Sequence, residues 1–425
     1  MLNIQMIALA IFILTYLLVI LFYHKKSLIV WASVVIILLF GVLSWKQALV
    51  SINLNVMFLY IGMLFVSELF LYSKMPDFLA EIFASKAKRV GGAMLIICAI
   101  TGILSIFLEN VAVVLLMAPI ALSVATKCKI NPVPLFIGIA LTSNLQGAAT
   151  LIGDPPSMLL AGFTGMSFND FFFIDGKPGI FFAVQLAFIA SLAVLYFVFR
   201  KENKLMPNLN REKHITIIPT ILVLLLIISL IISSSFESSI SYMNGLICLF
   251  FGLVGFSWYI LHYKREEKIK AFVKKMDWDT AVFLAGIFIL VECISANGLL
   301  NYVSDFILSL GGGSTLTIFI AIVLFSVLLS AFVDNVPFLL AMLPVIKTVT
   351  ENLGTSPYLF YFGLLIGASV GGNITPIGAS ANIVAMGIMK KRGHNVKFME
   401  FVRIGFIFTL VAVLAACLFL WFVYS

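Results

Sequence analysis

The feature that most limits what this chain can fold into is a close succession of long apolar runs. Continuous runs lie near residues 3–23, 28–44, 54–72, 178–199, 215–234, 242–262, 280–297 and 401–424. A helix needs about 20 apolar residues to cross a bilayer, and only 11% of the residues are charged, against roughly 25% in soluble domains. The runs lack the alternation of apolar and polar residues that is typical of membrane barrels. We therefore expect an all-α polytopic membrane protein and exclude a water-soluble enzyme.

Four further apolar segments are interrupted in the middle. Segments 91–126 and 314–350 each contain a polar break, and segments 134–165 and 357–390 each contain a break rich in Gly, Pro and Asn. Non-helical backbone inside a membrane persists only where protein or a water-filled cavity satisfies its N–H and C=O groups. The first pair is predicted to form re-entrant hairpins, and the second pair discontinuous helices.

The interrupted segments belong to an internal repeat. A shift of 225 residues places Glu109-Asn110-Val111 on Asp334-Asn335-Val336. The same shift superposes Pro119 on Pro344, Gly147 on Gly372, Thr150 on Thr375 and Gly153 on Gly378, and a shift of 224 superposes Gly62 on Gly286 and Glu68 on Glu292. We expect an extra span at 1–27, a first repeat at 28–200, a linking loop and spans at 201–262, and a second repeat at 263–425.

The basic residues predict the orientation of the two copies. If both termini lie outside, all Lys and Arg residues except Lys46, Lys177 and Lys347 fall in cytoplasmic loops, as the positive-inside rule requires. The repeats are then inverted in an inner (cytoplasmic) membrane. Inverted repeats with broken helices are typical of secondary transporters. A passive channel and the membrane subunit of an ATP-driven pump remain as alternatives.

Acidic residues inside the apolar segments mark the expected site, because charge in hydrocarbon is costly. No Lys or Arg is expected at the membrane centre, which favours a Na⁺ or H⁺ site. The candidate ion- and solute-binding residues are Glu109, Asn110, Asn144, Thr150, Gly153, Asp154, Asp334, Asn335, Asn373, Thr375, Gly378 and Asn382, with Glu68 and Glu292 as secondary candidates and Na⁺ expected near Asn110, Asp154, Asp334 and Asn335. The alternative for the tip acids Glu109 and Asp334 is a structural role as helix caps.

Four motifs in order resemble the ion transporter superfamily. They are Glu109-Asn110-Val111 to Pro119, Ala149 to Pro156, Asp334 to Pro344, and Gly371-Gly372-Asn373 to Asn382. The branch with arsenite permeases, NhaD-type sodium/proton antiporters and the melanosomal P protein is the most similar, and the divalent-anion/sodium symporters are more distant. The resemblance implies a scaffold and a transport domain that move as an elevator, a homodimer, and ion sites at the hairpin tips and breaks.

These features predict a proton- or sodium-coupled transporter of a small inorganic ion or metalloid, of the arsenite/antimonite efflux or Na⁺/H⁺ exchange type. A sodium-coupled di- or tricarboxylate (citrate-like) or other anion symporter is the alternative, although the dicarboxylate symporters carry Ser-Asn-Thr at the tips where this chain has Glu-Asn-Val and Asp-Asn-Val. We expect no cofactor besides the coupling ion. The expected partners are the solute, membrane lipid and a second copy, with no nucleic acid; a cytosolic ATPase on the basic loops has no support.

Overall fold

The computed structural model describes all residues except 1, 23–24, 206–214, 236–241, 264–265 and 313. The helices of the first half are α1 (Leu2–Leu21), α2 (Lys26–Leu39), α3 (Trp45–Ser51), α4 (Leu54–Tyr72), α5 (Met75–Ala84), α6 (Val90–Ser105), α7 (Asn110–Cys128), α8 (Val133–Gly147), α9 (Pro155–Thr164) and α10 (Ile180–Phe199). Those of the second half are α11 (Ile217–Ser234), α12 (Met243–Tyr263), α13 (Glu266–Lys275), α14 (Trp278–Ala296), α15 (Leu299–Gly311), α16 (Thr315–Ser330), α17 (Asn335–Leu353), α18 (Tyr358–Gly371), α19 (Ser380–Lys391) and α20 (Phe398–Tyr424). Short elements complete the fold: the 3₁₀ turns η2 (Asn169–Phe171) and η3 (Gly372–Ile374), and the strands β1 (Phe173–Ile174) and β2 (Lys177–Pro178), which pair antiparallel.

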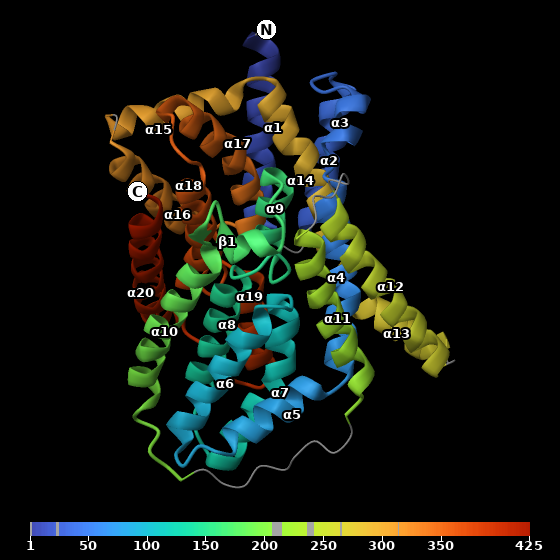
Figure 1. Ribbon diagram of the computed structural model, residues 1–425, viewed down its shortest axis with the longest axis vertical. Helices are drawn as coiled ribbons and strands as arrows, with labels where there is room; N and C mark the ends of the chain where they lie inside the picture. Colours follow the sequence, from blue (N-terminus) through green and yellow to red (C-terminus); the bar gives the residue numbers. More distant parts are fainter. Residues whose placement is uncertain (1, 23–24, 206–214, 236–241, 264–265, 313) are drawn as a thin grey trace.

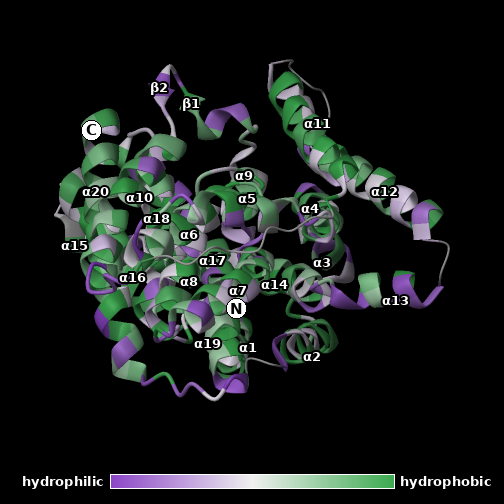
Figure 2. Ribbon diagram, turned by 90° about the horizontal axis from the view of Figure 1, so that it is seen from below, coloured by the Kyte–Doolittle hydropathy of each residue, from purple (hydrophilic) through white to green (hydrophobic). Residues whose placement is uncertain are grey.

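The all-α polytopic membrane fold is confirmed. Within the described residues, nine helices are long and apolar enough to cross a membrane. Large apolar side chains are exposed along outer helices such as α1, α11, α16 and α20. In Figure 2 the ribbons of α11 and α20 have mostly the hydrophobic colour. Lipid is the natural cover for such surfaces, whereas a soluble protein rarely exposes them.

The two predicted hairpins are α6–α7 and α16–α17. In Figure 1 the first lies in the lower half of the molecule and the second in the upper half, so they point in opposite directions with their tips toward the centre. Each tip acid begins the second arm as its N-cap: Glu109 Oε2 accepts from Ala112 N at 2.9 Å, and Asp334 Oδ1 from Val336 N at 3.4 Å. The caps supply acceptors for N–H groups that a helix start leaves without partners.

The two predicted discontinuous helices lie between the hairpins. The first is α8, a break at 148–154 and α9; the second is α18, a break that contains η3, and α19. The half-helices pack across the repeats, since α19 contacts α7 and α8 while α9 contacts α17 and α18. All residues of α8 and α18 beyond the first turn are buried, and so are all residues of the first break, whereas Ile377 in the second break is exposed.

The second half repeats the helix order of the first. The pair α1–α2 stands at the start of the first half, as α11–α12 does in the second half. The contact of α2 with α14 is equivalent to that of α12 with α4. The amphipathic α5 and α15 lie at opposite ends of the molecule, each beside its own hairpin. This order fits a division into α1–α10 and α11–α20; the boundaries given above, with a separate first span and linking spans, stay a prediction.

Candidate functional site

One small cavity lies where the two hairpin tips meet the two breaks. Its volume is about 50 Å³, enough for a bare ion or about one or two waters. It is lined by Lys26, Tyr60, Glu109, Asn110, Val111, Asn144, Asp154, Pro155, Pro156, Asp277, Thr280, Asp334, Asn335, Val336, Ala379, Ser380 and Ala381. The cavity therefore joins both repeats with the starts of α2 and α14.

Half of the candidate residues from the sequence line this cavity. They are Glu109, Asn110, Asn144, Asp154, Asp334 and Asn335. The remaining six, Thr150, Gly153, Asn373, Thr375, Gly378 and Asn382, are buried in the layer behind it. Their roles in binding stay predictions, but their positions separate groups that can touch a ligand from groups that hold the backbone.

The two carboxylate oxygens of Asp154 differ in their hydrogen bonding. As the N-cap of α9, it accepts hydrogen bonds at Oδ1 from Ser157 N at 3.1 Å and Ser157 Oγ at 2.8 Å. Its Oδ2 is buried and receives no hydrogen bond from the described residues, with the Asn110 side chain beside it. A buried polar atom without a partner is uncommon and costly. A bound cation or proton would satisfy this oxygen.

Three asparagines form a buried cluster next to this carboxylate. Asn144 Nδ2 donates to Asn373 Oδ1 at 2.8 Å and to Asn382 Oδ1 at 2.9 Å. Asn382 Nδ2 donates to the carbonyls of Gly372 and Thr375, and Asn373 Nδ2 to that of Leu141. Because both N–H bonds of Asn144 are used, its Oδ1 is the amide atom left for the cavity.

Threonine and glycine fix each break to its hairpin in the same way. Thr150 Oγ1 donates to Ile106 O, and Thr375 Oγ1 donates to Ala331 O at the equivalent position. A Cβ atom at Gly153 would collide with Gly147 O, and one at Gly378 with Gly372 O. Only glycine permits these close approaches of backbone to backbone.

The two tip asparagines are held differently. Asn110 Oδ1 accepts from Ser105 Oγ at 2.7 Å, whereas Asn335 is best oriented with its amide nitrogen donating to Ser330 Oγ at 2.9 Å and Gly378 O at 3.3 Å. A side chain at Gly147 would displace the Asn110 amide. The residues that each repeat contributes to the cavity form two half-sites, the first with Asn110 and the second with Asn335. These half-sites therefore present different amide atoms to the cavity.

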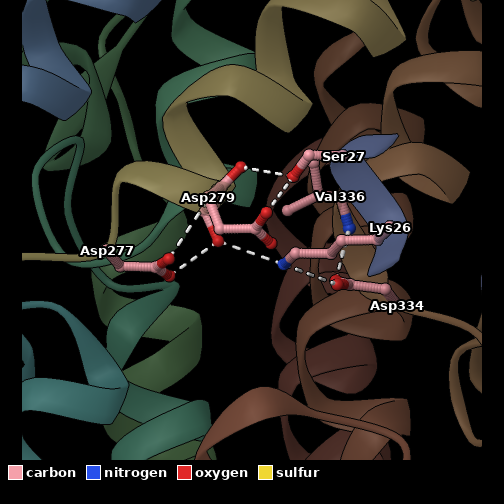
Figure 3. Close-up of polar contacts among 7 residues, drawn as sticks. Lys26, Ser27, Asp277, Asp279, Asp334 and Val336 are labelled. Atoms are coloured by element: carbon pink, nitrogen blue, oxygen red, sulfur yellow. Dashed lines mark hydrogen bonds and ion pairs between the residues drawn. The ribbon is translucent and has the colours of Figure 1, made fainter. Parts of the chain in front are cut away.

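A lysine lies in the site, and the expectation of no basic residue at the centre was wrong. Lys26 Nζ lies 3.7 Å from Asp334 Oδ2, as Figure 3 shows, and it donates to Thr280 Oγ1 at 3.0 Å. The side chain is only 7% exposed. The reason is that Lys26 begins α2, and the first turn of α2 packs on the start of α14 beside the second hairpin tip.

Sequence reasoning also missed Asp277 and Thr280 at the start of α14. Asp277 caps α14, accepting from Thr280 N at 3.1 Å and from Thr280 Oγ1 at 2.6 Å. The Asp-x-x-Thr pattern before an apolar run was a usable signal for this cap. With Asp277, the cavity has four carboxylates and one ammonium group.

The secondary candidates Glu68 and Glu292 do not line this cavity. Glu68 Oε1 lies 4.0 Å from Lys275 Nζ of α13. Glu292 lines a separate cavity with Lys347 and Glu351. Neither is therefore placed to share a ligand with Asp154 or Asp334.

Comparisons with known proteins agree with this architecture. The family profile described as citrate transporter (CitMHS) matches residues 9–307 and 289–425. A 46 kDa membrane protein of Mycobacterium leprae is 28% identical, with 99% of both chains covered. An uncharacterized transporter of Mycobacterium tuberculosis is 29% identical over 88% of this chain and 87% of its own. The P protein of Sus scrofa is 26% identical over 85% of this chain and 52% of its own length.

Two solved structures share the fold. The YdaH transporter of Alcanivorax borkumensis has a TM-score of 0.61 at 14% identity, covering 88% of this chain and 86% of its own. MtrF of Neisseria gonorrhoeae, described among antimetabolite efflux pumps, has a TM-score of 0.55 at 14% identity and covers 88% and 82%. At this identity the likeness shows the fold alone.

Proposed function

This chain belongs to the CitMHS citrate transporter family within the ion transporter superfamily, and on that premise we propose that it is a secondary active transporter driven by H⁺ or Na⁺. It is a multi-pass membrane transporter, as the family and the candidate spans require. The proposal adds the energy source and the site of the coupling ion.

The observation that carries the proposal is the cavity between the hairpin tips. It gathers four carboxylates, and the buried Asp154 Oδ2 has no hydrogen-bond partner among the described residues. Carboxylate and amide oxygens are the ligands that hard cations prefer. The coupling ion binds at Asp154, with Asn110 and Asn144 beside it, and Glu109 and Asp334 complete the acidic lining.

The transported solute is a small inorganic ion or metalloid species. A cavity of about 50 Å³ holds only a few atoms, and its net negative lining attracts cations and tolerates neutral hydroxides. Arsenite and antimonite efflux or Na⁺/H⁺ exchange are the activities that fit these two properties.

The open side of the cavity follows from Asp277. Asp277 is exposed and follows α13 by two residues, and the last turn of α13 carries Lys274 and Lys275. By the positive-inside rule this side faces the cytoplasm of an inner membrane. The site therefore opens inward in this conformation, and both termini lie on the outer side.

The helices suggest which part moves. Hairpins α6–α7 and α16–α17 pack with α8–α10 and α18–α20. Among the other helices, α4 packs against α12, and α2 packs against α14. The first set is the transport domain and the second set the scaffold of an elevator. Dimer formation and lipid contacts stay predictions.

The test is gradient-driven flux in proteoliposomes. Purified protein should accumulate labelled Na⁺ uphill under an imposed pH gradient, or labelled arsenite or antimonite uphill under an imposed pH or Na⁺ gradient, which a passive channel cannot do. Asp154→Asn should abolish this accumulation because the amide cannot replace the charged oxygen. Glu68→Gln, the same kind of change outside the cavity, should leave it intact. Normal uphill flux in Asp154→Asn would refute the assigned site.

Citrate or a related carboxylate is the second candidate. Lys26 supplies a positive group in the site, and the family's description names citrate. An anion would then bind together with a cation that neutralises the acidic lining. Labelled citrate uptake that requires the added cation, in the same vesicles, would favour this candidate over the inorganic ions.

A further inference from the structure

The two half-sites around the cavity carry different numbers of carboxylates. The first has Glu109 at the hairpin tip and Asp154 in the break. The second has Asp334 at the tip, but the position equivalent to Asp154 is Ala379. A mobile cation at the second half-site would therefore depend on Asp334 alone among the repeat-related acids.

The position beside Asp334 is already occupied by an ammonium group. Lys26 Nζ lies 3.7 Å from Asp334 Oδ2 and 3.0 Å from Thr280 Oγ1, two oxygen atoms that a small cation could use as ligands. Thr280 Oγ1 is itself bonded to Asp277, which also lines the cavity. Lys26 thus takes a place between hairpin and scaffold that is built from oxygen atoms (Figure 3).

The ammonium is held in that place by its own helix. Lys26 begins α2, and the next residue, Ser27, donates from Oγ to the Asp279 carbonyl at 2.9 Å. Trp31 Nε1 donates to Val282 O at 2.9 Å, one turn further along both helices. Nζ also lies 4.9 Å from the centre of the Phe283 ring, a favourable position for a cation.

We propose that Lys26 Nζ is a tethered cation that permanently fills the second half-site, so that this half-site binds no mobile coupling cation while Lys26 is present. The first half-site, with the unpartnered Asp154 oxygen, takes the mobile cation. Like charges a few ångströms apart repel each other, so Nζ excludes a second Na⁺ from the oxygens of Asp334 and Thr280. This inference rests on the proposed cation-coupled function.

The inference is tested by counting bound Na⁺. Purified wild-type protein, Lys26→Gln and Lys26→Arg are titrated with labelled Na⁺ by equilibrium dialysis at alkaline pH, where protons compete least. Lys26→Gln should bind one equivalent more than the wild type, because the amide is neutral and frees Asp334. Lys26→Arg should bind the wild-type number, and Lys26→Gln combined with Asp334→Asn should lose the additional equivalent.

The difference in bound Na⁺ between the wild type and Lys26→Gln tests the tethered cation separately from the proposed function. An equal number in the wild type and Lys26→Gln overturns the tethered cation, whatever that number is. No Na⁺ bound to the wild type and one bound to Lys26→Gln would support the tethered cation and contradict Na⁺ binding at Asp154. If Lys26→Gln does not fold, Lys26→Ala is titrated with Na⁺ in the presence and absence of methylammonium. Methylammonium should displace the additional Na⁺, because it occupies the place that the lysine ammonium group has left. If Lys26→Ala binds no additional Na⁺, or if methylammonium displaces none, the inference is also overturned.

Discussion

The two oxygen atoms of the Asp154 carboxylate have separate roles: Oδ1 accepts hydrogen bonds from Ser157, and Oδ2 is the proposed ligand of the cation. Ser157 bonds to Oδ1 through both its backbone N–H and its hydroxyl group, which fixes the plane of the carboxylate and aims Oδ2. Groups that orient a ligand atom contribute to metal affinity although they never touch the metal. Ser157 is therefore a positioning residue for the proposed cation.

Replacing Ser157 by Ala is expected to lower cation affinity by about 10-fold or more, because Oδ1 keeps only its backbone donor and the carboxylate can rotate. Titration of Na⁺-dependent uptake measures this change. The control is Ser191→Ala on α10, where the buried hydroxyl group has no hydrogen-bond partner among the described residues. Equal effects of the two replacements would contradict a role for Ser157 in orienting Asp154.

Residue types predicted the charged part of the site where an acid contrasted with the surrounding apolar sequence. Glu109, Asp154 and Asp334 were recognisable for that reason, and all three line the cavity. Lys26 was not, because a lysine at the end of an apolar run resembles any loop lysine. Only the packing of α2 against α14, which brings the start of α2 beside Asp334, distinguishes the two cases.

At the scale of elements, each break is fastened to its hairpin by one threonine. Thr150 and Thr375 donate to the carbonyls of Ile106 and Ala331, just after the first arm of each hairpin. These carbonyls lie where the helix ends and lack the partners that a continuing helix would provide. Each threonine therefore connects its discontinuous helix to the hairpin of the same repeat.

Thr150→Val and Thr375→Val should each destabilise the protein by about 1–3 kcal/mol, the cost of leaving a buried acceptor without its donor. Thermal unfolding in detergent measures the loss. Thr142→Val on α8 serves as the control, because Thr142 Oγ1 donates to carbonyls of its own helix. Melting temperatures that fall as far in the control as in the two variants would argue against the fastening role.

Periodicity and breaker residues predicted the elements well. The eight continuous runs correspond to helices of the structure, each hairpin to a pair of helices, and the two breaks to the segments that separate α8 from α9 and α18 from α19. The short α3 and α13 were not predicted as helices. Because α13 is highly charged, it lacks the apolar pattern on which the prediction relied. Its helical signal is the charge distribution, with Glu266 and Glu267 in the first turn and Lys274 and Lys275 in the last, which complements the helix dipole.

At the scale of the whole molecule, a pair of equivalent glycines shows a further difference between the two repeats. Asn53 Nδ2 donates to Gly162 O at 2.8 Å, and a Cβ atom at Gly162 would collide with Val56. The equivalent glycine of the second repeat, Gly387, has open space around it. The start of α4 is therefore packed on α9, whereas α14 has no such neighbour at Gly387.

Under the proposed elevator motion, the two packings exchange. Gly162→Ala should disfavour the present conformation by about 1–3 kcal/mol, whereas Gly387→Ala should disfavour only the alternative one. Hydrogen–deuterium exchange is the measurement: Gly162→Ala should increase exchange near 53–56 and decrease it near 277–280, and Gly387→Ala should not. Identical exchange patterns in the two variants would contradict the exchange of packings.

The asparagine cluster has a consequence for biosynthesis. Asn144 is translated early, yet both acceptors of its amide, Asn373 and Asn382, are synthesised more than 200 residues later. Until they arrive, an amide intended for the protein interior must persist in a nascent chain surrounded by lipid, where polar groups without partners are costly. A product truncated before Gly372 is thus expected to be recognised by membrane proteases, and to survive only when the missing half is supplied as a separate polypeptide.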